Sequence, residues 1–217
     1  MAAPYHLMDR HPPLDPDLVE LLSSVETATI GHVEHLGFVG DNVRPIAPAH
    51  VAGIAVTVAA PGRDGNIIYK AIDTLLAGDI LVISRVDRDD IACVGGGVAT
   101  AAKAKGAAGI VIDGPCTDID EIASIGLPVW CRGVSSRTTN RTQSVGGSLN
   151  VPIACGAAAV LPGYAVLADS AGVFVAEIAR MRSLAKAALE RQERSAAVRA
   201  HLARGQSIFN FRQEPIP

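Results

Sequence analysis

The fold is decided by ILVI (80–83), VATAAKAK (98–105), GIVID (109–113), DIDEIASI (118–125) and PVWC (128–131). The first, third and fifth segments are short, continuous apolar runs, typical of strands that are covered on both faces. The second and fourth segments have the composition of helices, and glycines at positions 106 and 126 are suited to cap their C-termini. Strand, helix, strand, helix and strand at this spacing predict right-handed crossovers and a largely parallel sheet.

The segments on either side of this stretch predict a chain in three parts. Residues 1–14 contain three prolines and are expected to form a loose arm before a helix capped by Asp15 or Asp17. Residues 144–176 hold short apolar runs separated by glycine-containing turns, which predicts an antiparallel, hairpin-rich half. A long helix is expected at Glu177–Arg204. The three parts are an N-terminal arm and helix (1–24), an α/β domain (25–176) and a C-terminal helix with its tail (177–217).

Composition argues against several classes of function. The chain has 217 residues, 49% of them hydrophobic, a formal net charge of −3 and a pI near 6.0. It has no basic run before residue 180, which argues against a nucleic-acid surface. It also has no apolar run of the roughly 20 residues that cross a bilayer, and no apolar core of a signal peptide. We therefore expect a cytoplasmic protein with reduced, buried cysteines, which are Cys93, Cys116, Cys131 and Cys155.

The first candidate binding loop is Cys93–Thr100, which contains the glycine triplet Gly95, Gly96 and Gly97 followed by Val98. Three glycines before a helix leave backbone N–H groups uncovered, and the helix N-terminus adds positive potential. Such a loop can hold a carboxylate, phosphate or enolate oxygen. A flexible turn without a ligand explains the same residues equally well.

The second candidate loop is Asp113–Glu121, which carries four carboxylates in nine residues. Carboxylate oxygens are the ligands that hard divalent cations prefer. Helix capping is the alternative, because Thr117 is a suitable N-cap residue and acidic residues stabilise the first turn of a helix. Both loops follow strands of one parallel sheet, and ligands of open α/β sheets bind at that edge.

Other polar residues are weaker candidates. His32, Glu34 and His35 can hold a metal, but the two histidines are three residues apart and are interpreted as surface or interface residues. Three arginines flank a loop rich in Ser, Thr and Asn and can reach an anionic substrate, although solvated loop charges explain them as well. They are Arg132, Arg137 and Arg141.

Several blocks in register resemble the RraA-like superfamily, which includes the 4-hydroxy-4-methyl-2-oxoglutarate aldolases and the regulator of ribonuclease activity A. The main block is GGGVATAAKAKGAAGIVIDGPCTD (95–118). The others are Arg44-Pro45-Ile46, AVTVAAPGRDGN (55–66), AGDILVI (77–83), GLPVW (126–130), GGSLNVPIACGAAAVLPG (146–163) and ADSAG (168–172).

The resemblance implies a three-layer β/β/α fold of the swivelling-domain type, here with a C-terminal helical extension. It implies a homotrimer or hexamer with active sites at subunit interfaces. It also implies a class II aldolase, in which Mg²⁺ or Mn²⁺ binds a small keto acid and stabilises the enolate that C–C cleavage releases. The same activation decarboxylates oxaloacetate.

Carried over residue by residue, the resemblance assigns metal binding to Asp118 and a following acidic position to Glu121. Gly95 opens the loop whose amides receive the keto acid. Two positions depart from the family pattern: its carboxylate-binding arginine is Thr117 here, and an acidic residue is Gly96. A hydroxyl does not replace a bidentate arginine.

Another cation, Arg132 or Lys103, is a candidate to restore the lost charge. A further acidic ligand is expected from a neighbouring subunit's C-terminal helix, where Glu190 and Glu193 are available.

Two functional hypotheses follow. The first is a metal-dependent carbon–carbon lyase, an aldolase or decarboxylase, in which Thr117 and Asp118 are catalytic. Its substrate would contact Gly95, Gly96, Gly97, Val98 and Thr117, and its metal would bind Asp118 with Glu190 or Glu193. The second is a non-catalytic regulator that binds a protein partner.

Overall fold

A mixed sheet with a parallel centre forms the middle of the molecule, in a computed structural model that describes residues 4–87, 90–142 and 145–211. Its strand order is β1-β7-β3-β4-β5-β6-β2. The segment from β3 to β6 is parallel throughout, which confirms the prediction. The central strands are β3 (Val51–Ala60), β4 (Asp79–Arg85), β5 (Gly109–Asp113) and β6 (Val129–Cys131).

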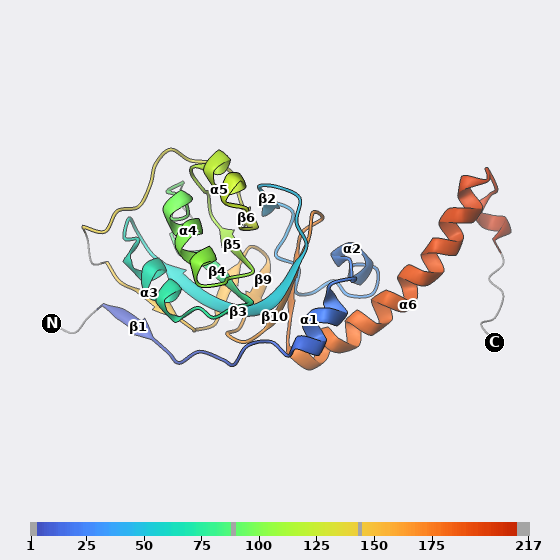
Figure 1. Cartoon of the computed structure of the whole chain (residues 1–217), viewed down its shortest axis with the longest axis horizontal. Coiled ribbons are helices and arrows are strands. Elements are labelled where there is room, and N and C mark those ends of the chain that lie inside the picture. Colours follow the sequence, from blue (N-terminus) through green and yellow to red (C-terminus); the bar gives the residue numbers. More distant parts are fainter. Residues whose placement is uncertain (1–3, 88–89, 143–144, 212–217) are drawn as a thin grey trace.

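Helices cover one face of this sheet and a small second sheet covers the other (Figure 1). The helical layer consists of α3 (Asn66–Thr74), α4 (Gly96–Ala104) and α5 (Ile119–Ile125). The second sheet is the antiparallel hairpin of β8 (Ile153–Cys155) and β9 (Ala158–Val160). Aliphatic residues fill both interfaces, as a core with few aromatics requires. The molecule therefore has the expected three-layer β/β/α fold.

The hairpin-rich half is also present. Strand β10 (Ala165–Ala168) pairs antiparallel with both β3 and β11 (Val173–Ala176). The buried carboxylate of Asp169 shapes the turn between β10 and β11, accepting hydrogen bonds from Ala171 N at 2.8 Å and Gly172 N at 3.2 Å. The same carboxylate accepts the Thr27 hydroxyl at 2.6 Å and fixes the start of α2 (Thr27–Ile30).

The predicted loose arm spans residues 1–14, of which 1–3 lie outside the described residues, and the described part is not loose throughout. Its residues 5–7 form β1 (Tyr5–Leu7), which pairs in parallel with β7 (Gly147–Leu149). The sequence did not reveal this pairing because the partner strand lies about 140 residues away along the chain. The following helix, α1 (Pro16–Leu22), is capped by Asp15 as predicted, and β2 (Arg44–Pro45) closes the far edge of the sheet.

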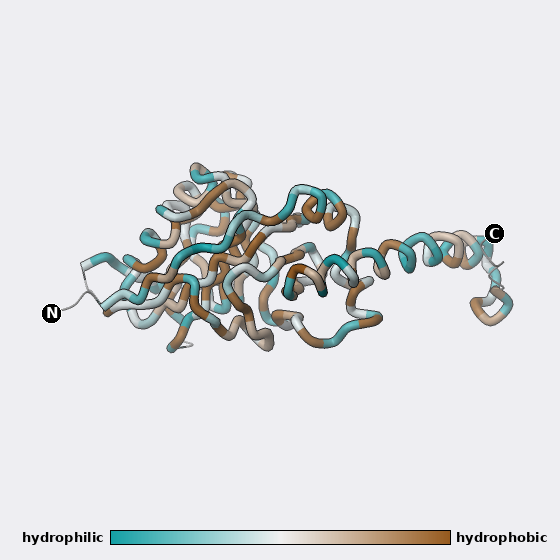
Figure 2. Tube along the Cα trace, turned by 90° about the horizontal axis from the view of Figure 1, so that it is seen from below, coloured by the Kyte–Doolittle hydropathy of each residue, from teal (hydrophilic) through white to brown (hydrophobic). Residues whose placement is uncertain are grey.

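The C-terminal extension is the helix α6 (Ile178–Ala203), followed by the 3₁₀ turn η1 (Ile208–Asn210). Its first turns bury Met181, Leu184 and Ala188 against α1, α2 and β11. Its remainder projects away from the body, with hydrophilic and hydrophobic residues alternating along it (Figure 2). The apolar residues of α6 are therefore buried only in its first half, and Leu202 near its end is exposed. Among the described residues, no helix combines the length and apolar character needed to cross a membrane.

Asp64 ties the N-terminal strand to the loop that precedes β7. Its carboxylate accepts the Tyr5 hydroxyl at 2.7 Å, Asn66 N at 2.9 Å, Val145 N at 2.9 Å and Gly146 N at 3.4 Å. Burial acts to raise the pKa of this carboxyl, and the hydrogen bonds together outweigh burial and lower it. Because the pKa is lowered on folding, Asp64 stabilises the fold above its ordinary pKa, and this contribution is lost as the pH falls.

We predict that Asp64→Asn lowers the free energy of unfolding at pH 7 by about 2–3 kcal/mol, because an amide cannot accept all of these hydrogen bonds. Denaturant unfolding measures the change. The gap from the wild type is expected to narrow as the pH falls below the ordinary pKa of an aspartate, about 3.9, because the unfolded chain then binds a proton before the folded chain does. The exposed Asp73→Asn is the matched control, with an effect below about 0.5 kcal/mol. A gap that stays constant or widens in acid would contradict this role.

Candidate functional site

The two candidate loops lie side by side. Val94 and Cys116 form a parallel bridge, and Thr117 N donates to Val94 O at 2.9 Å. The adjacency follows from the parallel pairing of β4 with β5, which places the segments that follow both strands at one edge of the sheet. The expectation that both loops share this edge is confirmed.

The glycine triplet begins the helix rather than preceding it. Gly95 is the N-cap of α4, and Gly96 and Gly97 are its first two residues, whereas the sequence predicted a start at Val98. The uncovered N–H groups therefore belong to the positive end of a nine-residue helix. One of them, Gly96 N, donates to Asp118 Oδ2 at 3.1 Å.

Asp118 has a backbone conformation that directs its side chain towards α4. Its φ of 53° is left-handed, which is uncommon for a residue other than glycine. It occupies the N-cap position of α5, yet its side chain makes no capping hydrogen bond there. The predicted capping role of Thr117 is wrong, because the Thr117 hydroxyl instead donates to Asp118 Oδ1 at 3.1 Å. Capping therefore does not explain this aspartate.

Two carboxylates of the second candidate loop, Asp113–Glu121, lie against the backbone of the first candidate loop, Cys93–Thr100. A Cβ added to Gly95 would lie 2.5 Å from Asp118 Oδ2, and a Cβ added to Gly96 would overlap the carboxylate of Glu121. These glycines are therefore required by the approach of the carboxylates. At Gly96, where the resemblance leads one to expect an acidic side chain, the carboxylate of Glu121 fills the position instead.

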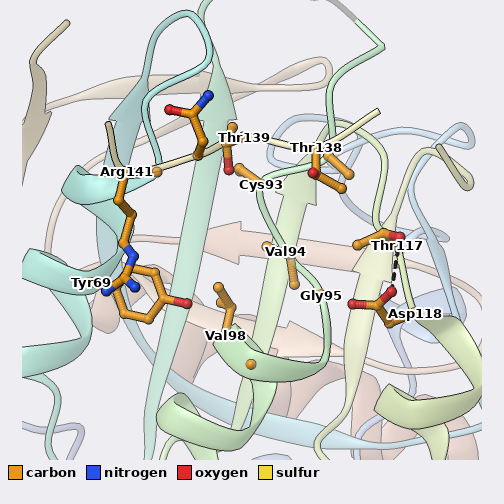
Figure 3. Close-up of a pocket in the computed structure, with 14 residues that line it drawn as sticks. Tyr69, Cys93, Val94, Gly95, Val98, Thr117, Asp118, Thr138, Thr139 and Arg141 are labelled. Carbon is orange, nitrogen blue, oxygen red and sulfur yellow. Dashed lines mark hydrogen bonds between the residues drawn. The ribbon is translucent and has the colours of Figure 1, made fainter. Parts of the chain in front are cut away.

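A cavity of about 270 Å³ opens between these loops, α3 and the segment Thr138–Arg141. Figure 3 shows Thr117 and Asp118 on one side and Tyr69 with Arg141 on the opposite side. The Arg141 guanidinium lies 5.4 Å from the centre of the Tyr69 ring. The lining residues are Gly65, Tyr69, Ala92, Cys93, Val94, Gly95, Gly97, Val98, Thr117, Asp118, Thr138, Thr139, Asn140 and Arg141.

Most of the predicted site residues meet at this cavity. Gly95, Gly97, Val98, Thr117 and Asp118 line it, and Gly96 contributes the N–H that Asp118 accepts. The structure also brings in residues that the sequence did not indicate, namely Tyr69 and the run Thr138–Asn140. Sequence reasoning missed them because Tyr69 lies in a helix 26 residues before Gly95, and Thr138 lies in a loop 43 residues after it.

Neither cation proposed to replace the missing arginine lines the cavity. Arg132 forms an ion pair with Asp113, with Nε 2.7 Å from Oδ1, and Lys103 donates to the carbonyl of Ile125. Glu190 and Glu193 are exposed on α6, and neither lies at the cavity of its own chain. Their assignment to the site of a neighbouring subunit stays a prediction.

The polar cluster near residue 34 has a structural role. Glu34 pairs with Arg180 at 2.7 Å and accepts the backbone N–H groups of His35 and Leu36. The hydrogen bond from Arg180, helped by the two backbone donors, lowers the pKa of Glu34 to about 2. Across the described parts of the chain, no three His, Cys, Asp or Glu side chains form a metal-binding group.

The four cysteines are buried thiols, as expected. Of these, Cys93 lines the cavity, while Cys116 and Cys131 lie in the strand ends and loop behind it. A hydrogen bond from Cys116 lowers the pKa of Cys131 to about 7, against the effect of burial. The same hydrogen bond and burial raise the pKa of Cys116, which keeps that thiol protonated next to Thr117.

Sequence comparison finds relatives of this chain whose names state a function. A Halalkalibacterium halodurans protein named "Putative 4-hydroxy-4-methyl-2-oxoglutarate aldolase" is 34% identical over 125 residues, which are 58% of this chain and 59% of that protein. An Arabidopsis thaliana protein with the same name, numbered 3, is 30% identical over 115 residues, which are 53% of this chain and 68% of its own length. The match thus spans less than two thirds of the first relative.

Solved structures share the fold. Streptomyces coelicolor RraAS2, described as an unusual member of the RNase ES inhibitor RraA protein family, matches with a TM-score of 0.76 at 24% identity, covering 88% of this chain and 98% of that one. An uncharacterized protein from Pseudomonas syringae pv. tomato matches with a TM-score of 0.78 at 21% identity, covering 92% and 94%. The RraA-like family model, described as Aldolase/RraA, matches residues 23–175. The chain therefore belongs to the RraA-like family.

Proposed function

We propose that this protein is a divalent-metal-dependent carbon–carbon lyase, of the aldolase or decarboxylase type, that acts on a small keto acid in the cavity beside α4. One observation carries the proposal. The exposed carboxylate of Asp118 is turned towards the N-terminus of α4 by a left-handed backbone and does not cap its own helix. Local strain of this kind persists where surrounding structure enforces it, and it concentrates at functional sites.

The residues at the cavity suit Mg²⁺ or Mn²⁺ better than a metal ion whose ligands all come from the protein. Mg²⁺ keeps several waters and takes one or two carboxylates together with oxygens of the substrate. Asp118 is the carboxylate that would hold it, and Glu121 lies next to it along the backbone of Gly96. When bound, the metal would draw electron density from the keto acid and stabilise the enolate formed by C–C cleavage.

The chain's own groups supply the rest of the site. The N-terminus of α4 places positive potential and backbone N–H groups beside the carboxylate, where an oxyanion of the substrate can be received. The Thr117 hydroxyl donates a hydrogen bond to Asp118 Oδ1 and so orients the carboxylate that would bind the metal. The relatives named as aldolases support the choice of a keto acid.

We also propose that the protein assembles as a trimer or hexamer, in which Glu190 or Glu193 of a neighbouring subunit reaches this cavity. Both acids are exposed on α6. Analytical ultracentrifugation is expected to give a trimer or hexamer, and Glu190→Gln or Glu193→Gln to weaken Mn²⁺ binding. A monomer with full metal-dependent activity would contradict the assembly.

We predict that Asp118→Asn lowers Mg²⁺-dependent release of pyruvate, or decarboxylation of oxaloacetate, by roughly 100-fold or more. Asparagine tolerates the left-handed backbone and keeps the shape of the side chain, so the variant is expected to fold. Asp120→Asn is the matched control, because Asp120 is exposed in the same helix and does not line the cavity. Wild-type rates that are equal with and without metal, or an active Asp118→Asn, would refute the proposal.

We predict that Gly95→Ala weakens Mn²⁺ binding about tenfold without unfolding the chain. Its backbone φ of −145° suits any residue, but the new Cβ would lie 2.5 Å from Asp118 Oδ2 and displace that carboxylate. Titration calorimetry measures the affinity. Gly172→Ala is the control, because a Cβ there meets nothing within 4 Å. Unchanged Mn²⁺ affinity in Gly95→Ala would mean that Asp118 does not hold the metal in this position.

A further inference from the structure

We infer that the thiols of Cys116 and Cys131 form a modification site, at which a hydroperoxide oxidises the pair to an intramolecular disulfide. Both residues are buried on the helical side of the sheet, in one hydrophobic core. Cys131 ends β6, and Cys116 lies in the loop that carries Asp118. The effect of oxidation on metal binding rests on the proposed function, whereas formation of the disulfide does not.

The backbone brings the two cysteines together at one carbonyl oxygen. Cys116 N donates to Gly133 O at 2.9 Å, and Cys131 Sγ donates to the same oxygen at 3.3 Å. The two segments run side by side, because Arg132 N donates to Gly114 O at 2.9 Å. The Cys116 thiol also donates a hydrogen bond to Cys131 Sγ. Two sulfurs in this contact need only a small movement to reach the geometry of a disulfide.

Cys131 is the thiol that a peroxide oxidises first. The hydrogen bond from the Cys116 thiol, acting against burial, lowers the pKa of Cys131 to about 7. The thiolate is the form of cysteine that attacks a peroxide, so this hydrogen bond favours the reaction at neutral pH. Cys131 also keeps 5% of its surface exposed, against 0% for Cys116. Cys116 is therefore the resolving thiol of the pair.

With hydrogen peroxide as the oxidant, the reaction balances in two steps. The Cys131 thiolate attacks one peroxide oxygen, the O–O bond breaks, and the hydroxide that leaves combines with the proton released by the thiol. The sulfur of Cys116 then attacks the sulfenic acid formed on Cys131, so that the S–S bond forms and the S–O bond breaks. The second hydroxide takes the Cys116 proton. Two thiols have lost two electrons, and one peroxide has become two waters.

The disulfide would encircle α5 and pull on the loop that holds Asp118. Cys116 lies between Val94 and Val134, with which it forms parallel bridges on either side. An S–S bond of about 2.05 Å is shorter than a hydrogen-bonded contact between two sulfurs, so closing it draws Cys116 towards β6 and away from Val94. The contact between Gly96 N and Asp118 Oδ2 spans the same junction. Oxidation is therefore expected to weaken metal binding at Asp118.

The first test treats the reduced full-length protein with hydrogen peroxide at about pH 8, above the pKa of Cys131. Trypsin releases both cysteines in one peptide, residues 106–132, while Cys93 and Cys155 lie in other peptides. Mass spectrometry is expected to find this peptide lighter by two hydrogens and unreactive towards iodoacetamide until dithiothreitol is added. A peptide that keeps both thiols, or a link from either cysteine to Cys93, would overturn the proposal.

Three variants assign the two thiols. Cys131→Ala is expected to leave Cys116 reduced, and Cys116→Ala to accumulate a sulfenic acid on Cys131 that dimedone traps. Cys155→Ala is the matched control, because Cys155 is equally buried but lies on the other side of the sheet, and it is expected to form the disulfide as the wild type does. Unfolding midpoints show that the variants fold. Dimedone labelling of Cys93 in place of Cys131 would contradict the assignment.

The second test measures Mn²⁺ affinity by titration calorimetry after the peroxide has been removed. The oxidised wild type is expected to bind Mn²⁺ about tenfold more weakly than the reduced protein, and peroxide treatment is expected to leave the affinity of Cys131→Ala unchanged. If the disulfide forms and the affinity stays the same, the coupling to the metal site is refuted. If the reduced protein does not bind Mn²⁺, the proposed function is refuted, while the disulfide stands on the first test.

Discussion

The hydrogen bond from Gly96 N to Asp118 Oδ2 joins the two halves of the site, and the arrangement around it depends on this contact. It links the N-terminus of α4 to the loop before α5, which otherwise meet through backbone bonds at Val94 and Cys116. The contact requires glycine at position 95 and a left-handed backbone at Asp118. A carboxylate held beside a positive helix end is suited to bring a cation and an oxyanion together.

The two departures from the family pattern have different consequences. At position 96 the carboxylate of Glu121 occupies the place of a Cβ on Gly96, although Glu121 is not among the residues that line the cavity. At position 117 the lost arginine is not replaced locally, since the Thr117 hydroxyl is used on Asp118. Positive charge reaches the cavity from the opposite wall through Arg141. The charges around the cavity therefore differ from those that the resemblance leads one to expect.

The sequence by itself determined the layered α/β fold, since continuous apolar strands alternating with short helices leave few topologies. It also determined that Gly95 and Asp118 meet at one sheet edge, because consecutive parallel strands place their following loops together. Tertiary structure alone decided which charges face the cavity. Arg132, Arg137 and Arg141 look alike in sequence, and only the positions of Asp113, Asp90 and Tyr69 separate them. Such pairings join residues far apart along the chain, and no local pattern encodes them.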